Sequence, residues 1–463
     1  MVTRACKVSG SGRDYLFARS KDSNGARAAR AGGKFGADDP RALTCAITEQ
    51  TDQTTDVATL APQTMSANAT VSAESSVPRA RGGPLALTAG YCAAFIALGL
   101  TTASLGPTLP ALAAQTHARL GLIGLLLTAR SLGFLLASLR GGRLYDLRAG
   151  HPLMTLALVS MAALMALAPV PAQLWLLALV MLALGAAEGL LDVGGNTLLT
   201  WAHDERSIGA AFNAVHLCYA VGATLAPALI ARTINHSVGL SYWTLALLVL
   251  PAAALLICLP SPAPRASAHD EPHAPARPQL VLLFALFFAL YVGAEVCFGG
   301  WIATYALARR LSDAAGAALL TSVFYGALML GRLCAIPLAA RLRPRTILCA
   351  DLIGCLCGLA LLLTGAGVLV WPGVFIVGLS MASIFPTTMA FAGRHMQITG
   401  RVTGRFLVGA SLGSMTLPWF TGQLFEAFGP GAVMIVITCT IIGALFVFGA
   451  MLRAARLAAL ARR

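Results

Sequence analysis

Lysine and acidic residues are scarce in this sequence of 463 residues, of which only 11% are charged. A soluble globular chain carries about 25% charged residues, so the composition excludes an ordinary soluble protein. All three lysines lie in the first 34 residues, and every later permanent cation is an arginine. The first 80 residues are polar, without a periodic apolar face or the apolar core of a secretory signal. We therefore expect a disordered tail at 1–80.

Sequence motifs of enzymes and metal sites are missing as well. There is no paired-histidine metal motif, phosphate-binding loop or nucleophile motif, so we expect neither an enzyme nor a metal or organic cofactor. The eleven cysteines lie mostly within apolar runs, and we interpret them as small apolar residues rather than disulfides or metal ligands.

Long apolar runs are what the sequence has in abundance, since 57% of its residues are hydrophobic and its mean hydropathy is +0.76. About 20 residues in a helix span a bilayer, and lipid-facing backbone must satisfy its own hydrogen bonds. The runs predict twelve transmembrane helices in an all-α membrane protein. These spans are 84–106, 120–140, 152–169, 173–200, 207–231, 241–260, 280–306, 315–336, 346–366, 370–392, 403–424 and 430–452.

A polar, proline-rich segment at 261–279 divides these spans into two sets of six. Glycine patterns also repeat between the two sets at an offset close to 193 residues: Gly185 falls on Gly378, for example. Duplicated halves are typical of transporters. We therefore expect two pseudo-symmetric six-helix bundles, at 81–260 and 280–463, joined by a cytoplasmic linker at 261–279.

The arginines are distributed unequally between the two sides of the predicted membrane. From residue 79 onward, 19 arginines fall on one side and four on the other, with Arg332 counted on the richer side at the end of span 315–336. The positive-inside rule makes the richer side cytoplasmic. We expect an inner-membrane protein with both termini in the cytoplasm. The net charge of +14 then reports topology and attraction to lipid headgroups, and not nucleic-acid binding.

Several ionisable residues lie deep in the predicted spans, where each costs about 2.5–3.5 kcal/mol on insertion scales. Glu188 and Asp192 share one face of the fourth span, Glu295 lies mid-span in the seventh, and Arg130 lies mid-span in the second. Such groups face the bundle interior and often mark ion pathways. One interpretation is a cation-coupling site made by Asp192, with Glu188 and Glu295 as further candidates. The alternative is a structural pair between Arg130 and a carboxylate that locks helices together.

Other polar residues on neighbouring spans could contribute to the same interior. Asn213 and His216 lie on the fifth span, and His216 could carry a proton near neutral pH, although a membrane histidine is more often simply hydrogen-bonded. Trp301, in the sequence Gly-Gly-Trp near the outer end of the seventh span, could either stack on a sugar ring or anchor the helix at the interface.

The loop at 141–150, Gly-Gly-Arg-Leu-Tyr-Asp-Leu-Arg-Ala-Gly, resembles the cytoplasmic signature of the major facilitator superfamily, with its second base and glycine each one residue late. The resemblance implies that Asp146, Arg143 and Arg148 form a gate that closes by charge pairing and opens when the pairing breaks. In the alternative interpretation these residues are solvated charges that set the orientation of the chain in the membrane. That interpretation fits the two arginines better than the aspartate.

Residues 84–455 resemble more closely the branch of this family that contains the sodium-dependent glucose transporter-like proteins and the fucose permeases. The segments that carry this resemblance are Thr128–Gly133, Gly142–Asp146, Asp192–Asn196, Gly299–Trp301 and Ile384–Thr387. It implies that Asn196 and Asn213 bind substrate hydroxyls, joined by His216 and Trp301. The first span lacks the carboxylate that the fucose permeases use, so Glu188 or Glu295 would take that task.

These patterns predict a secondary active transporter, most consistent with a monomeric symporter that couples a sugar to sodium ions or protons by alternating access in the lipid bilayer. An exporter of drugs or metabolites would use the same architecture. A non-transporting membrane sensor fits less well, because the sequence shows no soluble signalling domain.

Overall fold

The computed structural model describes residues 84–204, 207–262, 278–396 and 400–460, and every regular element in these ranges is a helix. The expected all-α class is therefore confirmed. The described helices fall in one unit, Glu74–Arg463. The predicted tail at 1–80 and most of the predicted linker at 261–279 lie outside the described residues, so these two boundaries remain predictions.

The apolar runs form fifteen helical segments within the described ranges. The first half of the chain contains α1 (Pro84–Thr102), α2 (Leu105–Gln115), α3 (Leu120–Ile123), α4 (Leu125–Leu147), α5 (Gly150–Leu167), α6 (Leu174–Ala202), α7 (Ile208–Thr233) and α8 (Val238–Ile257). The second half contains α9 (Pro278–Ala308), α10 (Ala314–Arg341), α11 (Pro344–Leu363), α12 (Gly367–Met381), α13 (Ile384–Gly393), α14 (Gly400–Phe428) and α15 (Gly431–Leu460).

Within the described residues, eleven helical stretches are long and apolar enough to cross a membrane. The remaining long helix, α14, occupies the place of the predicted span 403–424. Twelve spans follow when the pairs α1–α2, α3–α4 and α12–α13 are each counted as one. The observed helices extend beyond several predicted spans: α10 continues to Arg341, and α15 continues to Leu460.

Two spans are broken in the middle, and each break precedes a proline. The chain leaves helical geometry after Thr102 and again after Met381, and it resumes within three residues. Proline lacks an N–H, so Pro107 cannot bond the carbonyl of Ala103, and Pro386 cannot bond that of Ala382. Such breaks are tolerated in membranes only where neighbouring groups satisfy the freed backbone.

Glycines at equivalent places allow helices to approach closely in both halves. A Cβ atom on Gly185 of α6 would collide with the Arg130 carbonyl of α4, and one on Gly378 of α12 would press on the Phe324 carbonyl of α10. The offset of 193 residues read from the sequence therefore corresponds to equivalent contacts between equivalent helices.

A second pair of contacts repeats in the same way. A Cβ atom on Gly222 of α7 would overlap the Ile96 carbonyl of α1, and one on Gly413 of α14 would overlap the Ala289 carbonyl of α9. Small residues at such positions are the usual device for packing membrane helices, because lipid gives no hydrophobic drive for their association. The two halves thus use one packing scheme, as the prediction of pseudo-symmetric bundles requires.

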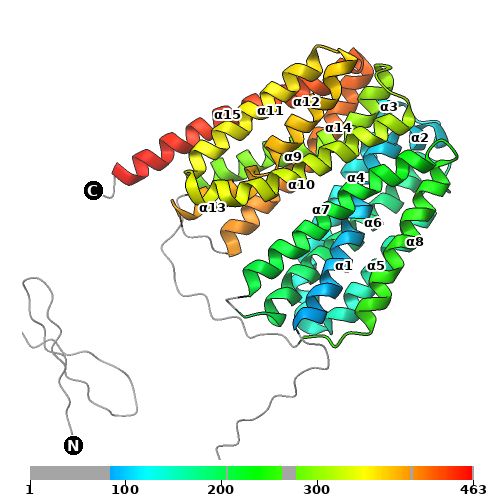
Figure 1. Ribbon diagram of the computed structural model, residues 1–463, viewed down its shortest axis with the longest axis horizontal. Coiled ribbons are helices and arrows are strands. Elements are labelled where there is room, and N and C mark those ends of the chain that lie inside the picture. The colour runs from blue at the N-terminus through cyan, green and yellow to red at the C-terminus, as the bar shows by residue number, and fades with distance from the viewer. Residues whose placement is uncertain (1–83, 205–206, 263–277, 397–399, 461–463) are drawn as a thin grey trace, which may run out of the picture. The chain divides into compact units, whose positions relative to one another are not determined.

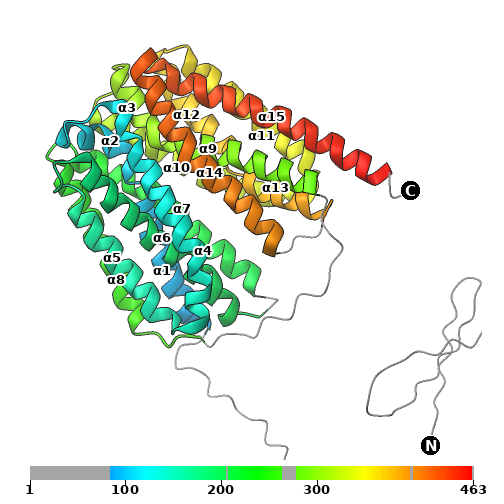
Figure 2. The same ribbon diagram turned by 180° about the vertical axis from the view of Figure 1, so that it is seen from behind.

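The two halves meet at one end and diverge toward the other, as both views show (Figure 1, Figure 2). They meet at the end that the arginine distribution predicts to be outer, where a Cβ on Gly106 of α2 would overlap the Gly299 carbonyl of α9. Nearby, the Thr128 hydroxyl of α4 donates to the Met415 carbonyl of α14 at 2.7 Å. We call this zone of contact the outer seam.

A polar cluster fastens the outer rim of the seam. Glu426 of α14 accepts a hydrogen bond from the Gly121 backbone N–H at 3.0 Å, and Gln423 donates to the Gly121 carbonyl at 3.0 Å. Arg119 lies 3.6 Å from the Glu426 carboxylate, but its side chain is 80% exposed. We call Gly121, Gln423 and Glu426 the outer latch.

Candidate functional site

A cavity of about 1740 Å³ lies between the two halves beneath the outer seam. Its wall is formed by α1, α4, α6 and α7 on one side and by α9, α10, α13 and α14 on the other. It reaches Leu139 and Leu342 at the predicted inner helix ends, and both side chains are exposed there. The cavity is therefore closed toward the predicted outer side and open toward the predicted inner side.

Arg130 and Glu188 form a buried ion pair on the first-half wall. The Arg130 Nε donates to Glu188 Oε2 at 2.8 Å, and its Nη2 also reaches the other carboxylate oxygen. The same guanidinium donates to the carbonyls of Thr101 and Thr102, at 2.9 and 3.0 Å, where α1 ends. Arg130 thus donates to backbone carbonyls at the break between α1 and α2, and its guanidinium group is the cation that pairs with the Glu188 carboxylate. The sequence left open whether Glu188 belongs to a cation-coupling site or pairs with Arg130 to hold helices together. This contact is the second of these, a structural pair.

Asp192 lines the same wall one turn further along α6. Its Oδ1 accepts a hydrogen bond from Asn196 Nδ2 at 3.2 Å, and that amide also donates to the Asp192 carbonyl at 2.9 Å. Within the described residues, no basic side chain lies within 4 Å of the Asp192 carboxylate. Asn196 is not among the residues that line the cavity. It is turned toward Asp192, so its contact is with the carboxylate and not with the open space.

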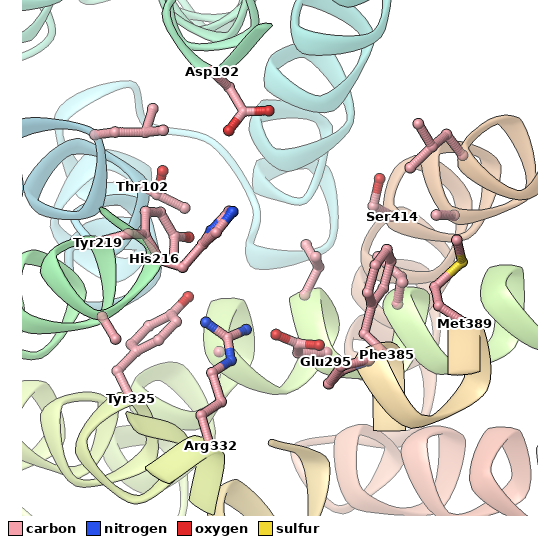
Figure 3. A pocket seen from close by; sticks show the side chains of 18 of the residues that line it. Thr102, Asp192, His216, Tyr219, Glu295, Tyr325, Arg332, Phe385, Met389 and Ser414 are labelled. Atoms are coloured by element: carbon pink, nitrogen blue, oxygen red, sulfur yellow. The ribbon is translucent and has the colours of Figure 1, made fainter. Parts of the chain in front are cut away.

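Polar groups of α7 face Asp192 and the cavity interior (Figure 3). Asn213 and His216 are exposed to the cavity, and the His216 ring packs edge-on against Phe95 with the centroids 5.5 Å apart. Tyr219, one turn further along, lines the cavity as well. The sequence predicted Asn213 and His216 here but missed Tyr219, although its position three residues after His216 places it on the same helical face.

Glu295 of α9 lines the second-half wall, across the cavity from Asp192 (Figure 3). Its carboxylate is hydrogen-bonded to the Tyr291 hydroxyl, which also lies 3.0 Å from the Met381 carbonyl at the end of α12. Tyr325 of α10 stands beside it on the same wall. The structure therefore places two acids on opposite walls, one from each half.

Arg332 corrects the arginine count on which the predicted orientation rests. The sequence counted it among the cytoplasmic arginines, but it lines the cavity, and Figure 3 shows its guanidinium pointing toward the Glu295 carboxylate. The two groups interact electrostatically but lie beyond the 4 Å of an ion pair. The reason is length: α10 extends to Arg341, so Arg332 lies about two and a half turns inside its inner end.

Trp301 is not brought to the cavity, which corrects the expectation that its ring is open to a solute. The side chain is fully buried in the outer seam, and its Nε1 donates to the Pro418 carbonyl at 3.1 Å. Its ring packs against Phe425 with the centroids 5.5 Å apart. Trp301 therefore joins α9 to α14 beside the closed end of the cavity, and in this conformation no face is left for a sugar.

The three predicted gate residues lie at the inner end of α4. Arg143, Asp146 and Arg148 are all exposed, and no ion pair to them occurs within the described residues. Tyr145, between them, is fully buried and donates to the Leu190 carbonyl at 2.9 Å. An open inner side leaves such charges apart, so the arrangement accords with the predicted gate without testing it.

No cluster of three or more metal-ligating side chains occurs among the described His, Cys, Asp and Glu residues. The deep charges instead sort into one closed pair, Arg130 with Glu188, one facing but separated pair, Arg332 with Glu295, and Asp192 with an amide partner. The site can therefore bind polar solutes and small cations.

Comparison with known families gives a match to the model described as Major Facilitator Superfamily, over residues 91–414. Among curated proteins, sodium-dependent glucose transporter 1A of Mus musculus is 29% identical over 389 residues, which cover 75% of this chain and 91% of that protein. Sodium-dependent glucose transporter 1 of Xenopus laevis is 32% identical over 361 residues, covering 70% and 73%. The human major facilitator superfamily domain-containing protein 4A is 25% identical over 444 residues, covering 73% and 86%.

Solved structures with the same arrangement of helices include the nucleoside transporter NupG and a D-xylose–proton symporter. The first has a TM-score of 0.63 at 14% identity and covers 80% of this chain and 98% of its own. The second has a TM-score of 0.63 at 12% identity and covers 78% and 97%. At these identities the likeness shows the fold alone.

Proposed function

Because the chain belongs to the major facilitator superfamily and is a multi-pass membrane transporter rather than an enzyme, we propose that it takes up a sugar in symport with sodium ions or protons. Transport would proceed by alternating access, in which the two halves rock about the central cavity. The observation that carries this proposal is a cavity between matched halves, closed at one end, with an acid that has no resident cation on its wall.

A hydroxyl-rich solute fits the polar groups that converge in the cavity. Asn213, His216, Tyr219 and Tyr325 together offer both donors and acceptors, while the partly exposed Phe385 supplies an aromatic surface. A few polar groups in a largely apolar cavity are the usual basis of solute specificity. The curated relatives named as sodium-dependent glucose transporters make a sugar the first solute to test.

Asp192 is the residue that we assign to the coupling cation. Glu188 already has Arg130 within hydrogen-bond distance, whereas among the described residues the Asp192 carboxylate has the Asn196 amide as its side-chain partner. A carboxylate at this depth of the membrane is costly without a cation, so sodium or a proton is favoured there. Asn196 then acts as a positioning residue that orients the carboxylate, and Asn213 remains the candidate for direct contact with the solute.

The Asp192→Asn variant tests this assignment. We expect it to insert and fold normally but to lose gradient-driven accumulation at least tenfold, because an amide has no charge for the cation to neutralise. The measurement is uptake of labelled D-glucose into proteoliposomes under an imposed sodium gradient and, separately, an imposed proton gradient.

A matched control is Asp313→Asn, an acid-to-amide change at the exposed N-cap of α10, where its side chain accepts from the Gly316 N–H. Asparagine caps helices as well as aspartate does, so uptake by this variant should equal that of the wild type. Full accumulation by the Asp192→Asn variant would refute the assignment. If neither gradient drives uptake of any sugar in a panel, and loaded solute leaves instead, the protein is an exporter.

A further inference from the structure

The break between α12 and α13 brings three oxygen atoms from three places in the chain into one contact. The Tyr291 hydroxyl lies within hydrogen-bond distance of both the Glu295 carboxylate and the Met381 carbonyl. Met381 is the last residue of α12, so its carbonyl belongs to the negative end of that helix. Tyr291 is 1% exposed, whereas Glu295 also borders the cavity.

Counting hydrogens shows that this contact is one proton short when Glu295 is ionised. A tyrosine hydroxyl has a single hydrogen, and it faces two acceptors, a carboxylate and a carbonyl. A buried acceptor left without a donor costs about 1–3 kcal/mol. A proton on Glu295 removes the conflict, because the carboxyl then donates to the tyrosine oxygen while the hydroxyl donates to Met381.

The far side of the break is held separately. The Ser383 hydroxyl, in the break itself, donates to the Asp351 carboxylate of α11. Ser383 is 5% exposed, so this bond ties the unwound residues to the neighbouring helix. The Met381 carbonyl is thereby kept facing Tyr291 instead of being drawn into a continuous helix.

Titratable groups approach Glu295 from three other helices. Arg332 and Tyr325 approach from α10, Tyr219 from α7 and Cys355 from α11, whereas the α14 residues that line the cavity carry no titratable group. Arg332 is the only cation in this set, and it opposes the proton. It lies beyond ion-pair range of Glu295 in this conformation, and a closer approach would favour the ionised carboxylate.

We propose that Glu295, Tyr291 and the Met381 carbonyl form a proton-binding site at the α12–α13 break, separate from Asp192. In this inward-open conformation the site holds one proton: the Glu295 carboxyl group donates to the Tyr291 oxygen, and the Tyr291 hydroxyl donates to the Met381 carbonyl. Hard metal cations take six or more oxygen ligands, so three oxygens suit a proton better than a metal ion. The inference deepens the proposed function, on which its role in coupling rests. Each half then contributes one cation-binding acid, Asp192 in the first half and Glu295 in the second.

Infrared spectroscopy of the purified full chain tests the site without any solute. At neutral pH the wild type should show the carbonyl band of a protonated carboxyl group, which disappears reversibly on alkalinisation. The Glu295→Gln variant should lack that band. The Tyr291→Phe variant should show it at higher frequency, because the carboxyl group has lost its hydrogen-bond partner, and this second variant guards against misfolding of the first.

The matched control is Asp313→Asn, an acid-to-amide change at the exposed N-cap of α10, which should leave the band in place. Identical spectra for the wild type and the Glu295→Gln variant at neutral pH would overturn the proposal. Loss of the wild-type band on adding sodium chloride at constant pH would overturn it in favour of a sodium site. Because no solute is present, failure of sugar uptake leaves this result standing, so the two proposals fail independently.

Discussion

At the scale of single residues, the pair formed by Arg130 and Glu188 supports the first half of the molecule. Removing one member of a buried pair leaves an uncompensated charge and typically costs about 3–5 kcal/mol. We expect both Glu188→Gln and Arg130→Gln to lower the thermal unfolding temperature of the detergent-solubilised protein by several degrees. Arg130→Gln should be the more harmful, because it also removes the hydrogen bond that Arg130 donates to the Thr102 carbonyl.

The exposed pair of Arg119 and Glu426 supplies the control for that measurement. Surface ion pairs contribute about 0–1 kcal/mol, so Arg119→Gln should leave the unfolding temperature nearly unchanged. Equal effects of Arg119→Gln and Arg130→Gln would show that the buried pair does not stabilise the fold.

Sequence reasoning found the deep charges but not which of them meet. Mid-span positions identified Arg130, Asp192 and Glu295 because charge is costly anywhere in the hydrocarbon layer. It misplaced Arg332, because a charge near the end of an apolar run cannot be distinguished from an interfacial one until the helix length is known. Trp301 was misjudged for another reason: a position near a helix end does not reveal whether another helix covers it.

At the scale of helices, close approach at glycine is the feature most open to test. The Gly413→Ala substitution puts a Cβ into the Ala289 carbonyl of α9, and overpacking of this kind costs about 1–3 kcal/mol. Gly449 of α15 has open space around an added Cβ, so Gly449→Ala should be neutral or slightly stabilising through helix propensity. Thermal unfolding of the two variants should therefore shift in different directions, and a shared direction would contradict the packing argument.

The order and approximate positions of the spans were predictable, but the inner ends of α10 and α15 and the breaks within spans were not. Pro107 and Pro386 are visible in the sequence, yet proline also occurs at 227, 251 and 418 inside helices that continue. Whether a proline breaks a membrane helix depends on partners for the freed carbonyls, such as Arg130 for α1. Those partners come from other helices, and spacing along the chain does not show them.

At the scale of the whole molecule, the outer latch should govern which side of the cavity is open. Its two hydrogen bonds across the seam contribute about 1 kcal/mol each, so removing both should shift the balance between conformations by roughly thirtyfold. We expect the double variant Gln423→Ala/Glu426→Ala, which removes both side-chain partners, to favour the outward-open state. Spin labels at positions 139 and 342, introduced in a cysteine-free background, would then report shorter distances across the inner end.

The Arg119→Gln variant serves as the control here too, because that side chain is largely in water and should leave the distance distribution unchanged. If the double variant also leaves it unchanged, the latch does not hold the outer side shut.

The small free energy of the latch limits how tightly the protein needs to bind its cargo in order to release that latch. Binding at millimolar affinity releases about 4 kcal/mol, which already exceeds what the two latch bonds contribute. Only the difference in affinity between the two states counts toward opening the seam, so part of that energy is enough. We therefore expect a carrier of weak affinity and fast turnover, suited to abundant nutrients and unsuited to scavenging traces.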